Sequence, residues 1–292
     1  MSRGRHIVVL FRAGTSDEAI AGTAVYHLAH HWREAGHLVT FLRGARRFVP
    51  ADLAFVHVDL SVVPDEYLAL AASYPAAVNG RVRDVRRSTT SENLVTAGDG
   101  WSGPVIAKSD LNYGGGPELA SGFGRLVGRG AFGRRLLRLA DRIRPGILPS
   151  PFGSWRDYRI FDHRDAVPPR LRRDRRVVIE RFLPEMEGGL YHLGMYQFLG
   201  DRWSCVRIAS PEPLVKAGNS VRLEHVEPHP LLEEWRRRLH LDYGKMDYVL
   251  HEGRPVLLDA NKTVGAGGFA SGPELEARRR HRAAGIESFF PR

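Results

Sequence analysis

The stretch PVLLDANKTVG, residues 255–265, decides how this sequence is interpreted. Its first four residues form an uninterrupted apolar run, which predicts a buried strand. Asp259 and Asn261 follow at alternate positions, so their side chains point to the same side of that strand. Carboxylate and amide oxygens are ligands that Mg²⁺ prefers, and the ion shares such ligands with phosphate oxygens. A pair of ordinary surface acids is the simpler interpretation, but it leaves the apolar run before Asp259 unexplained.

A second strand, Lys245–Leu250, precedes this stretch and carries Asp247. The two strands form a predicted hairpin around Glu252 and Gly253, with His251 as a third loop residue if the loop is longer. A two-residue turn would face Asp247 away from Asp259, whereas a three-residue loop pairs Asp247 with Leu257 and places both acids on one face. We expect the three-residue loop, because a glycine stands at its left-handed third position. A bulge in the hairpin would also align the two acids.

A glycine-rich motif follows Lys108, the last residue of a predicted strand that begins at Val105. Gly114, Gly115 and Gly116 allow backbone N–H groups to surround an anion. A lysine beside them adds a point charge that suits phosphate. No GxxxxGK[ST] sequence is present, so this is not a P-loop, and a mobile turn is the simpler interpretation of three glycines.

The strand Val177–Leu183 ends at a proline and is followed by Glu185 and Glu187. Acids beyond a strand are usually solvated. The alternative is that this is an edge strand whose backbone contacts a flat base. A carboxylate that follows the strand would then bind the ribose hydroxyls.

Residues 6–80 predict an α/β layer with the order β-α-β-β-α-β. A capping box at Thr15–Glu18 begins a helix that has an apolar face including Val25 and Trp32 and that ends at Gly36. The first turn of this layer lacks the GxGxxG of a dinucleotide site.

The composition limits the classes of protein that fit. The chain has 292 residues, 43% of them hydrophobic, which allows a sizeable core and two or three domains. No apolar run is long enough to span a bilayer, and the single cysteine excludes an internal disulfide, so we expect a cytoplasmic protein. The net charge of +10 allows an anionic partner. Only four of the 43 basic residues are lysine, and three of the four, Lys108, Lys245 and Lys262, lie in or beside the motifs above.

Together these motifs resemble the ATP-grasp superfamily, in its glutathione synthetase, D-alanine ligase and ribosomal-protein glutamate ligase type. The resemblance covers roughly the whole chain and implies an α/β (α+β grasp) fold. It implies a Rossmann-like pre-ATP-grasp domain at residues 1–85, a lid subdomain at 86–183 and a metal-binding subdomain at 184–292. The two subdomains would contain antiparallel sheets.

The resemblance also implies roles for individual residues. The phosphates of ATP would be contacted by Arg87 or its neighbour Arg86, Lys108, Gly114, Gly115, Gly116 and Asn219. The adenine would be contacted by Glu180, Phe182 and Leu183, and the ribose by Glu187. Mg²⁺ or Mn²⁺ would be held by Asp247, Asp259 and Asn261. The catalytic residues would be Lys245, beside the transferring phosphoryl group, and Arg207.

Several features depart from the family pattern. Arg86 or Arg87 stands in place of the first lysine, although arginine also contacts phosphate. Asp259 stands where glutamate is commoner, which shortens the reach to a metal. No return strand is evident after Gly116, where a basic segment, residues 119–144, of open role intervenes.

The implied function is an ATP- and Mg²⁺-dependent, ADP-forming ligase that joins a carboxylate to an amine through an acyl phosphate. A small acid or a peptide is the expected substrate, with acidic character favoured by the basic residues, and a homodimer is allowed. An ATP-grasp kinase or phosphotransferase would use the same residues. A basic nucleic-acid-binding module is the remaining alternative, and it leaves the Asp-x-Asn strand end unexplained. A membrane partner is not expected.

Overall fold

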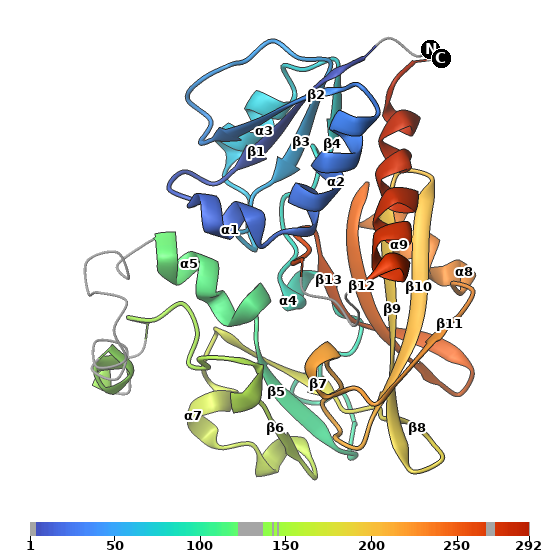
Figure 1. The fold of residues 1–292 in the computed structure, drawn as a ribbon. Helices are drawn as coiled ribbons and strands as arrows, with labels where there is room; N and C mark the ends of the chain where they lie inside the picture. The colour runs from blue at the N-terminus through green and yellow to red at the C-terminus, as the bar shows by residue number, and fades with distance from the viewer. Residues whose placement is uncertain (1–3, 122–136, 142, 145, 267–271, 292) are drawn as a thin grey trace. The chain divides into compact units, whose positions relative to one another are not determined.

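The computed structural model describes residues 4–121, 137–141, 143–144, 146–266 and 272–291. The chain forms two compact units (Figure 1). The first unit contains Met1–Asp59, Val63–Arg83 and Pro184–Arg292, and the second contains Leu60–Val62 and Asp84–Leu183. The division into three parts at residues 85 and 183 stays a prediction. Within the described ranges, no helix combines the length and the apolar character needed to cross a bilayer.

The first unit begins with a four-stranded parallel sheet in the order β2-β1-β3-β4. Its strands are β1 (His6–Phe11), β2 (Leu38–Arg43), β3 (Leu53–His57) and β4 (Ala76–Val78). Its helices are α1 (Asp17–Ala21), α2 (Ala24–Glu34) and α3 (Asp65–Ala71). The predicted order of the four strands is confirmed, and the apolar runs of β1 and β3 form its buried strands.

The helix predicted from Thr15 is instead two helices. Ser16, not Thr15, caps α1, and its Oγ accepts the backbone N–H of Ala19 at 3.2 Å. Thr23 then caps α2, and its Oγ1 accepts the backbone N–H of Tyr26 at 3.3 Å. A threonine that caps a helix has extended backbone angles, so the helical path is interrupted at this point.

A six-stranded antiparallel sheet forms most of the remaining first unit, in the order β11-β10-β9-β12-β13 with β8 paired to β9. Its strands are β8 (Glu185–Glu187), β9 (Leu190–Leu199), β10 (Arg202–Ser210), β11 (Arg222–His225), β12 (Tyr243–His251) and β13 (Arg254–Asn261). Helix α8 (Pro230–Arg238) packs on one face, where the guanidinium of Arg236 lies over the Phe198 ring. Helix α9 (Pro273–Ala283) packs against α2, β9 and β10 (Figure 1).

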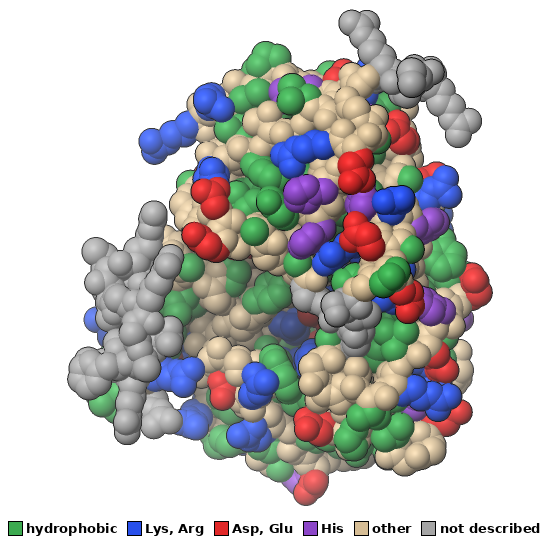
Figure 2. Space-filling model, viewed as in Figure 1, with side chains coloured by type: hydrophobic (Ala, Val, Ile, Leu, Met, Phe, Trp, Pro, Cys, Tyr) green, Lys and Arg blue, Asp and Glu red, His purple; other side chains and the backbone are tan. Residues whose placement is uncertain are grey.

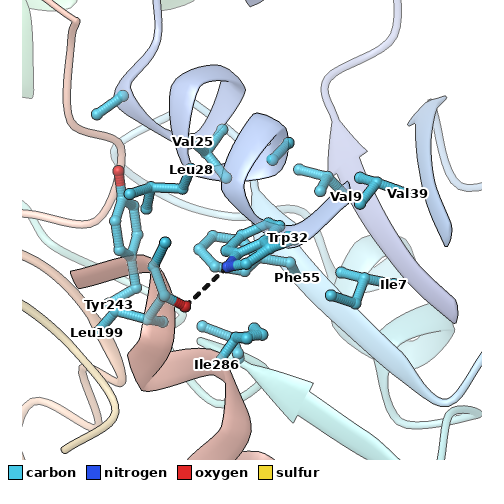
Figure 3. Close-up of a cluster of buried hydrophobic side chains, with 14 of the residues drawn as sticks. Ile7, Val9, Val25, Leu28, Trp32, Val39, Phe55, Leu199, Tyr243 and Ile286 are labelled. Carbon is cyan, nitrogen blue, oxygen red and sulfur yellow. Dashed lines mark hydrogen bonds between the residues drawn. The ribbon is translucent and has the colours of Figure 1, made fainter. Parts of the chain in front are cut away.

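One hydrophobic core joins the parallel sheet to the antiparallel sheet within this unit. Trp32 of α2 packs against Phe55 of β3, and its indole N–H donates to the carbonyl of Ala283 at 2.9 Å (Figure 3). Tyr243 of β12 and Ile286 complete the contact from the C-terminal side. The first and last parts of the chain therefore stabilise one another.

The two ends of the described chain also meet in this unit. The guanidinium of Arg5 lies 5.5 Å from the centre of the Phe290 ring. His37 Nε2 lies 2.8 Å from a carboxylate oxygen of Glu287, which belongs to the 3₁₀ segment η6 (Ala284–Phe289). The ends are held by an aromatic contact and a polar one.

The second unit is built on a three-stranded antiparallel sheet in the order β6-β5-β7. Its strands are β5 (Val105–Ser109), β6 (Arg159–Phe161) and β7 (Val177–Arg181). Its helices are α4 (Arg87–Thr90), α5 (Gly116–Ser121) and α7 (Pro169–Arg172), and its 3₁₀ segments are η1 (Asn112–Gly115), η3 (Trp155–Asp157) and η4 (Arg164–Ala166). Strand β6 is the return strand that the sequence did not reveal. Most of the basic segment 119–144 lies outside the described residues.

Candidate functional site

The turn of the β12–β13 hairpin differs from the prediction. His251 pairs with Arg254, so the loop contains only Glu252 and Gly253. Both residues have positive φ angles, 51° and 77°, as a type I′ turn requires. The expected three-residue loop is therefore wrong, because two left-handed residues close the hairpin and match the twist of its strands.

A bulge in the same hairpin brings the two predicted acids together. After Leu257 the register shifts by one residue, so Asp247 pairs with Asp259 and Leu258 is the extra residue. Residues directly opposite each other in an antiparallel pair share a face. The alternative of a bulge is thus confirmed, and Asp247 and Asp259 lie on the same face of the sheet.

Lys245 and Asn261 form the next pair along this face. Lys245 Nζ donates to Oδ2 of Asp247 at 2.8 Å, and Asn261 Nδ2 donates to Oδ2 of Asp259 at 2.9 Å. Asp247 and Asn261 are buried, with 5% and 4% of their surface exposed. The structure therefore brings all four predicted side chains together in two adjacent pairs.

The donor set of these side chains fits a divalent cation. Asp247 Oδ1 is buried, and no described residue donates a hydrogen bond to it. A buried carboxylate oxygen without a partner is unfavourable unless a cation or a donor binds. Among the described residues, no group of three or more His, Cys, Asp and Glu side chains could hold a metal ion. Asp247, Asp259 and Asn261 would therefore share an ion such as Mg²⁺ with phosphate oxygens or water.

Arg207 lies on the opposite face of the antiparallel sheet. Arg207 pairs with Gly194 of β9, and Gly194 also pairs with Tyr248 of β12. Tyr248 directly follows Asp247, so the side chains of Tyr248 and Arg207 point to the face opposite that of Asp247. The structure does not bring Arg207 to the side of Asp247. Its guanidinium instead contacts three carboxylates, at N–O distances of 2.6–3.0 Å, which belong to Glu185, Glu187 and Glu224. The hydrogen bond from Arg207 lowers the pKa of Glu187, the predicted ribose ligand.

Asn219 belongs to a short loop before β11, within the 3₁₀ segment η5 (Ala217–Asn219). Its Oδ1 accepts the backbone N–H of Lys216 at 2.7 Å, and its Nδ2 donates to Glu212 and to the carbonyl of Leu214. These contacts use both ends of the amide. Asn219 therefore braces the loop that contains residues 212–219.

In the second unit, Lys108 and Glu180 form a buried ion pair. Lys108 pairs with Val178 across β5 and β7, so Glu180 is its diagonal neighbour on the same face. The Lys108 Nζ lies 2.6 Å from Oε2 of Glu180, whose surface is fully buried. The predicted phosphate lysine and the predicted adenine acid are thus in direct contact.

Arg87 and Arg86 have different surroundings. Arg87 is buried, and its Nη1 donates to the carbonyls of Ser109 and Leu111 at 2.8 and 2.9 Å. Arg86 instead binds the carboxylate of Asp84 through Nε and Nη2. Arg87 therefore holds the chain directly after β5, where the glycine-rich motif begins.

The three glycines form a packed turn rather than an extended loop. Gly114 and Gly115 have φ angles of 65° and 76°, and Tyr113 before them has a φ of 51°. A Cβ on Gly115 would lie 3.1 Å from a methyl carbon of Leu111 and 3.3 Å from the ring of Pro149. Gly116 then begins α5. Both the positive φ and the close packing explain why glycine stands at position 115.

The predicted adenine hinge lies at the end of the second unit. The backbone N–H of Phe182 donates to the carbonyl of Pro104 at 2.9 Å. Leu183 is the last residue of this unit. The backbone N–H of Phe182 is thus occupied, and Leu183 is the hinge residue that stays a prediction for contact with a base.

Comparisons with known proteins concern the fold. No protein-family model and no curated protein matches the chain. It is similar to the RimK domain protein ATP-grasp from Sphaerobacter thermophilus DSM 20745, with 15% identity and a TM-score of 0.49, over 97% of this chain and 99% of that one. It is also similar to D-alanine–D-alanine ligase from Bacillus anthracis, with 10% identity and a TM-score of 0.48, over 98% of this chain and 96% of that one. The same ligase complexed with ATP gives 12% identity and a TM-score of 0.49, over 99% and 96%.

Proposed function

We propose that this protein is an ATP- and Mg²⁺-dependent ligase that joins a carboxylate to an amine. The bulged hairpin carries this proposal, because it aligns Asp247, Asp259 and Asn261 on one face and leaves a buried carboxylate oxygen for a cation. The Lys108–Glu180 pair in the second unit supports a nucleotide site, since it holds a lysine ammonium at the end of β5. We further propose ATP as the cosubstrate and Mg²⁺ as the ion.

In this mechanism a carboxylate oxygen of the substrate attacks the γ-phosphorus of ATP, and ADP leaves. The amine then attacks the acyl carbon of the acyl phosphate and loses a proton, and phosphate leaves. Bound Mg²⁺ would neutralise charge on the phosphate oxygens. Lys245 Nζ, held by Asp247 at 2.8 Å, would place a positive charge beside the transferring phosphoryl group.

No protein nucleophile is needed for these steps, and the one cysteine does not suggest another chemistry. Cys205 is buried beside the hydroxyl of Tyr248, and burial raises the pKa of its thiol to about 11. A thiol with this pKa stays protonated at neutral pH and is a poor nucleophile.

The metal ligands provide the direct test. We expect Asp247→Asn and Asp259→Asn to reduce Mg²⁺-dependent ADP release by about a hundredfold or more, because each removes a charge from the proposed site. Asp201→Asn is the matched control, since its carboxylate is exposed in the β9–β10 turn. Unchanged ADP release in both site variants would overturn the proposal.

The kinase alternative uses the same residues, so product analysis must separate the two. ADP release is measured with a panel of amino acids and peptides, with and without amine acceptors, and the products are weighed by mass spectrometry. A product joined through an amide supports the ligase. A stable phosphorylated product that forms without an amine would show a kinase.

The nucleic-acid alternative would require a basic surface. In the space-filling view, basic and acidic side chains are interspersed over the visible face (Figure 2). This alternative predicts steeply salt-dependent binding to DNA or RNA without ATP. Cytoplasmic localisation and a homodimer stay predictions.

A further inference from the structure

A small cavity lies over the face of the sheet that carries the proposed metal ligands. Gln197 of β9 pairs with Lys245 on one side and with Ser204 of β10 on the other. All three side chains therefore share the face of Asp247. Helix α9 packs over β9 and β10 on this face, and a cavity of about 40 Å³ remains between them. A space of this size accepts one small polar group.

Arg282 of α9 lines this cavity, and no described carboxylate forms an ion pair with it. It is buried, with 7% of its surface exposed. Its Nη1 donates to the Ser204 hydroxyl at 3.3 Å, and within the described part of the chain it forms no ion pair with a carboxylate. Burial lowers its pKa to about 10, so it stays charged at neutral pH. A buried charge without a partner is strongly unfavourable, which points to a missing anion.

Two further arginines of α9 increase the positive charge at this place. Arg278 and Arg279 also line the cavity, and the repulsion between their positive charges and that of Arg282 helps to lower the pKa of Arg282. Their own carboxylate partners are loose, at 3.9 Å to Glu274 and 3.6 Å to Glu276, and more than half of each acid is exposed. The acids therefore lie toward solvent, and the cavity keeps an excess of positive charge.

The position of the cavity indicates what the anion belongs to. Ser204 on β10 and Lys245 on β12 are separated by one strand, so they lie about 10 Å apart. An anion beside Arg282 is therefore too far from the hairpin ligands to be the group that they hold. It is close enough to belong to the same small substrate.

We propose that Arg282, assisted by Arg278 and Arg279, binds a non-reacting carboxylate of the substrate. The inference rests on the proposed ligase function and deepens it, because it makes the substrate an acid with at least two carboxylates. One carboxylate would react near Asp247 and the other would be anchored beneath α9.

Binding of glutarate, a dicarboxylate, tests this subsite without catalysis. We expect glutarate to raise the melting temperature of the wild-type protein and of Arg280→Met, and to leave that of Arg282→Met unchanged. Arg280 is the matched control, because it is an exposed arginine on the same helix. Butyrate, which has one carboxylate, should give a much smaller shift. Arg282→Lys keeps the charge and should recover part of the effect.

The outcomes are distinct. Equal shifts in wild type and Arg282→Met, or no shift in either, would overturn the proposal. A full shift with inorganic phosphate alone would also overturn it, in favour of a phosphate site. If Arg282→Met does not fold, as judged by circular dichroism, Arg279→Met replaces it with the same expected loss.

Turnover separates this proposal from the proposed function. With a dicarboxylate substrate, Arg282→Met should raise KM for that acid by about tenfold or more and leave KM for ATP unchanged. If glutarate binds through Arg282 but no acid supports ADP release, the proposed ligase function is wrong and the proposed carboxylate subsite is supported. If a dicarboxylate supports ADP release and Arg282→Met does not change it, the proposed ligase function is supported and the proposed carboxylate subsite is wrong.

Discussion

His57, at the end of β3, is fully buried, and neither of its ring nitrogens has a hydrogen-bond partner among the described residues. Burial, together with the nearby charge of Lys262, lowers its pKa from 6.5 to about 3. The unfolded chain therefore takes up a proton near pH 6.5, whereas the folded chain does not until about pH 3. The contribution of this residue to stability is complete above pH 6.5 and is lost as the pH falls toward 3.

We expect His57→Phe to make stability less dependent on pH. Between pH 5.5 and 4 the wild type should lose about 1.4 kcal/mol per pH unit through this residue, and the variant should not. Urea denaturation at several pH values measures the difference. His281→Phe, at an exposed position of α9, is the control and should keep the wild-type slope. Equal slopes for wild type and His57→Phe would contradict the assignment.

The candidate residues differ in how far the sequence could predict them. Asp259 and Asn261 share a side because alternation along one strand is a local property. The side on which Arg207 lies depends instead on the register of β10, β9 and β12. Arg282 was missed because its burial arises from packing against Ser204, 78 residues away in the sequence. In the sequence it belongs to an ordinary basic run.

At the scale of elements, the β12–β13 hairpin shows what turn chemistry can and cannot predict. The glycine at position 253 led us to expect a three-residue loop, but a left-handed glycine also closes the two-residue turn that the structure has. Glu252 also adopts a positive φ, which is uncommon for a residue with a Cβ. Strand β6 was missed for a related reason, because three residues, Arg159–Phe161, are too few to show a period.

Deleting Leu258 should be tolerated, because it is the extra residue of the bulge. The deletion leaves Asp259 opposite Asp247 and every other pair unchanged. Deleting Ala260 instead keeps the bulge, but it moves Asn261 to the other face, into the buried position opposite Met246. We expect the second deletion to lower the free energy of unfolding by at least about 2 kcal/mol more than the first, because it places a polar amide among apolar side chains.

Urea denaturation of the two deletion variants measures this difference, and circular dichroism establishes that both fold. The pair is matched, since each variant lacks one apolar residue of β13. A Leu258 deletion that is as damaging as the Ala260 deletion would show that the bulge itself is required for folding.

At the scale of the whole molecule, the composition indicated the size of the core but not which parts of the chain share it. The core around Trp32 includes a hydrogen bond to Ala283, 251 residues away in the sequence. The parallel sheet and the antiparallel sheet are consequently in one compact unit, with the residues of the second unit between them in the chain. Contacts of this separation leave no periodic pattern in a single sequence.

Binding of ATP should stabilise the whole chain by mass action. At a free MgATP concentration of a hundred times Kd, the gain is about 2.7 kcal/mol. For a chain of this size we expect the melting temperature to rise by about 5 °C. Calorimetry with ATP and either Mg²⁺ or EDTA measures the contribution of the ion.

The variant Asp259→Asn serves as the comparison in this experiment. We expect its melting temperature with ATP to be the same in Mg²⁺ and in EDTA, because the proposed ligand is missing. A wild-type protein that responds equally to ATP in Mg²⁺ and in EDTA would show that the ion is not part of the site.

The contact between Arg5 and the Phe290 ring allows the chain to be circularly permuted. A short peptide could join the two ends, and new ends could be opened at the exposed turn Pro211–Pro213. Such a permutant would keep the same core and hairpin while placing the antiparallel strands β11, β12 and β13 before the parallel sheet in the sequence. The order in which these elements leave the ribosome is thus separable from the arrangement that they adopt.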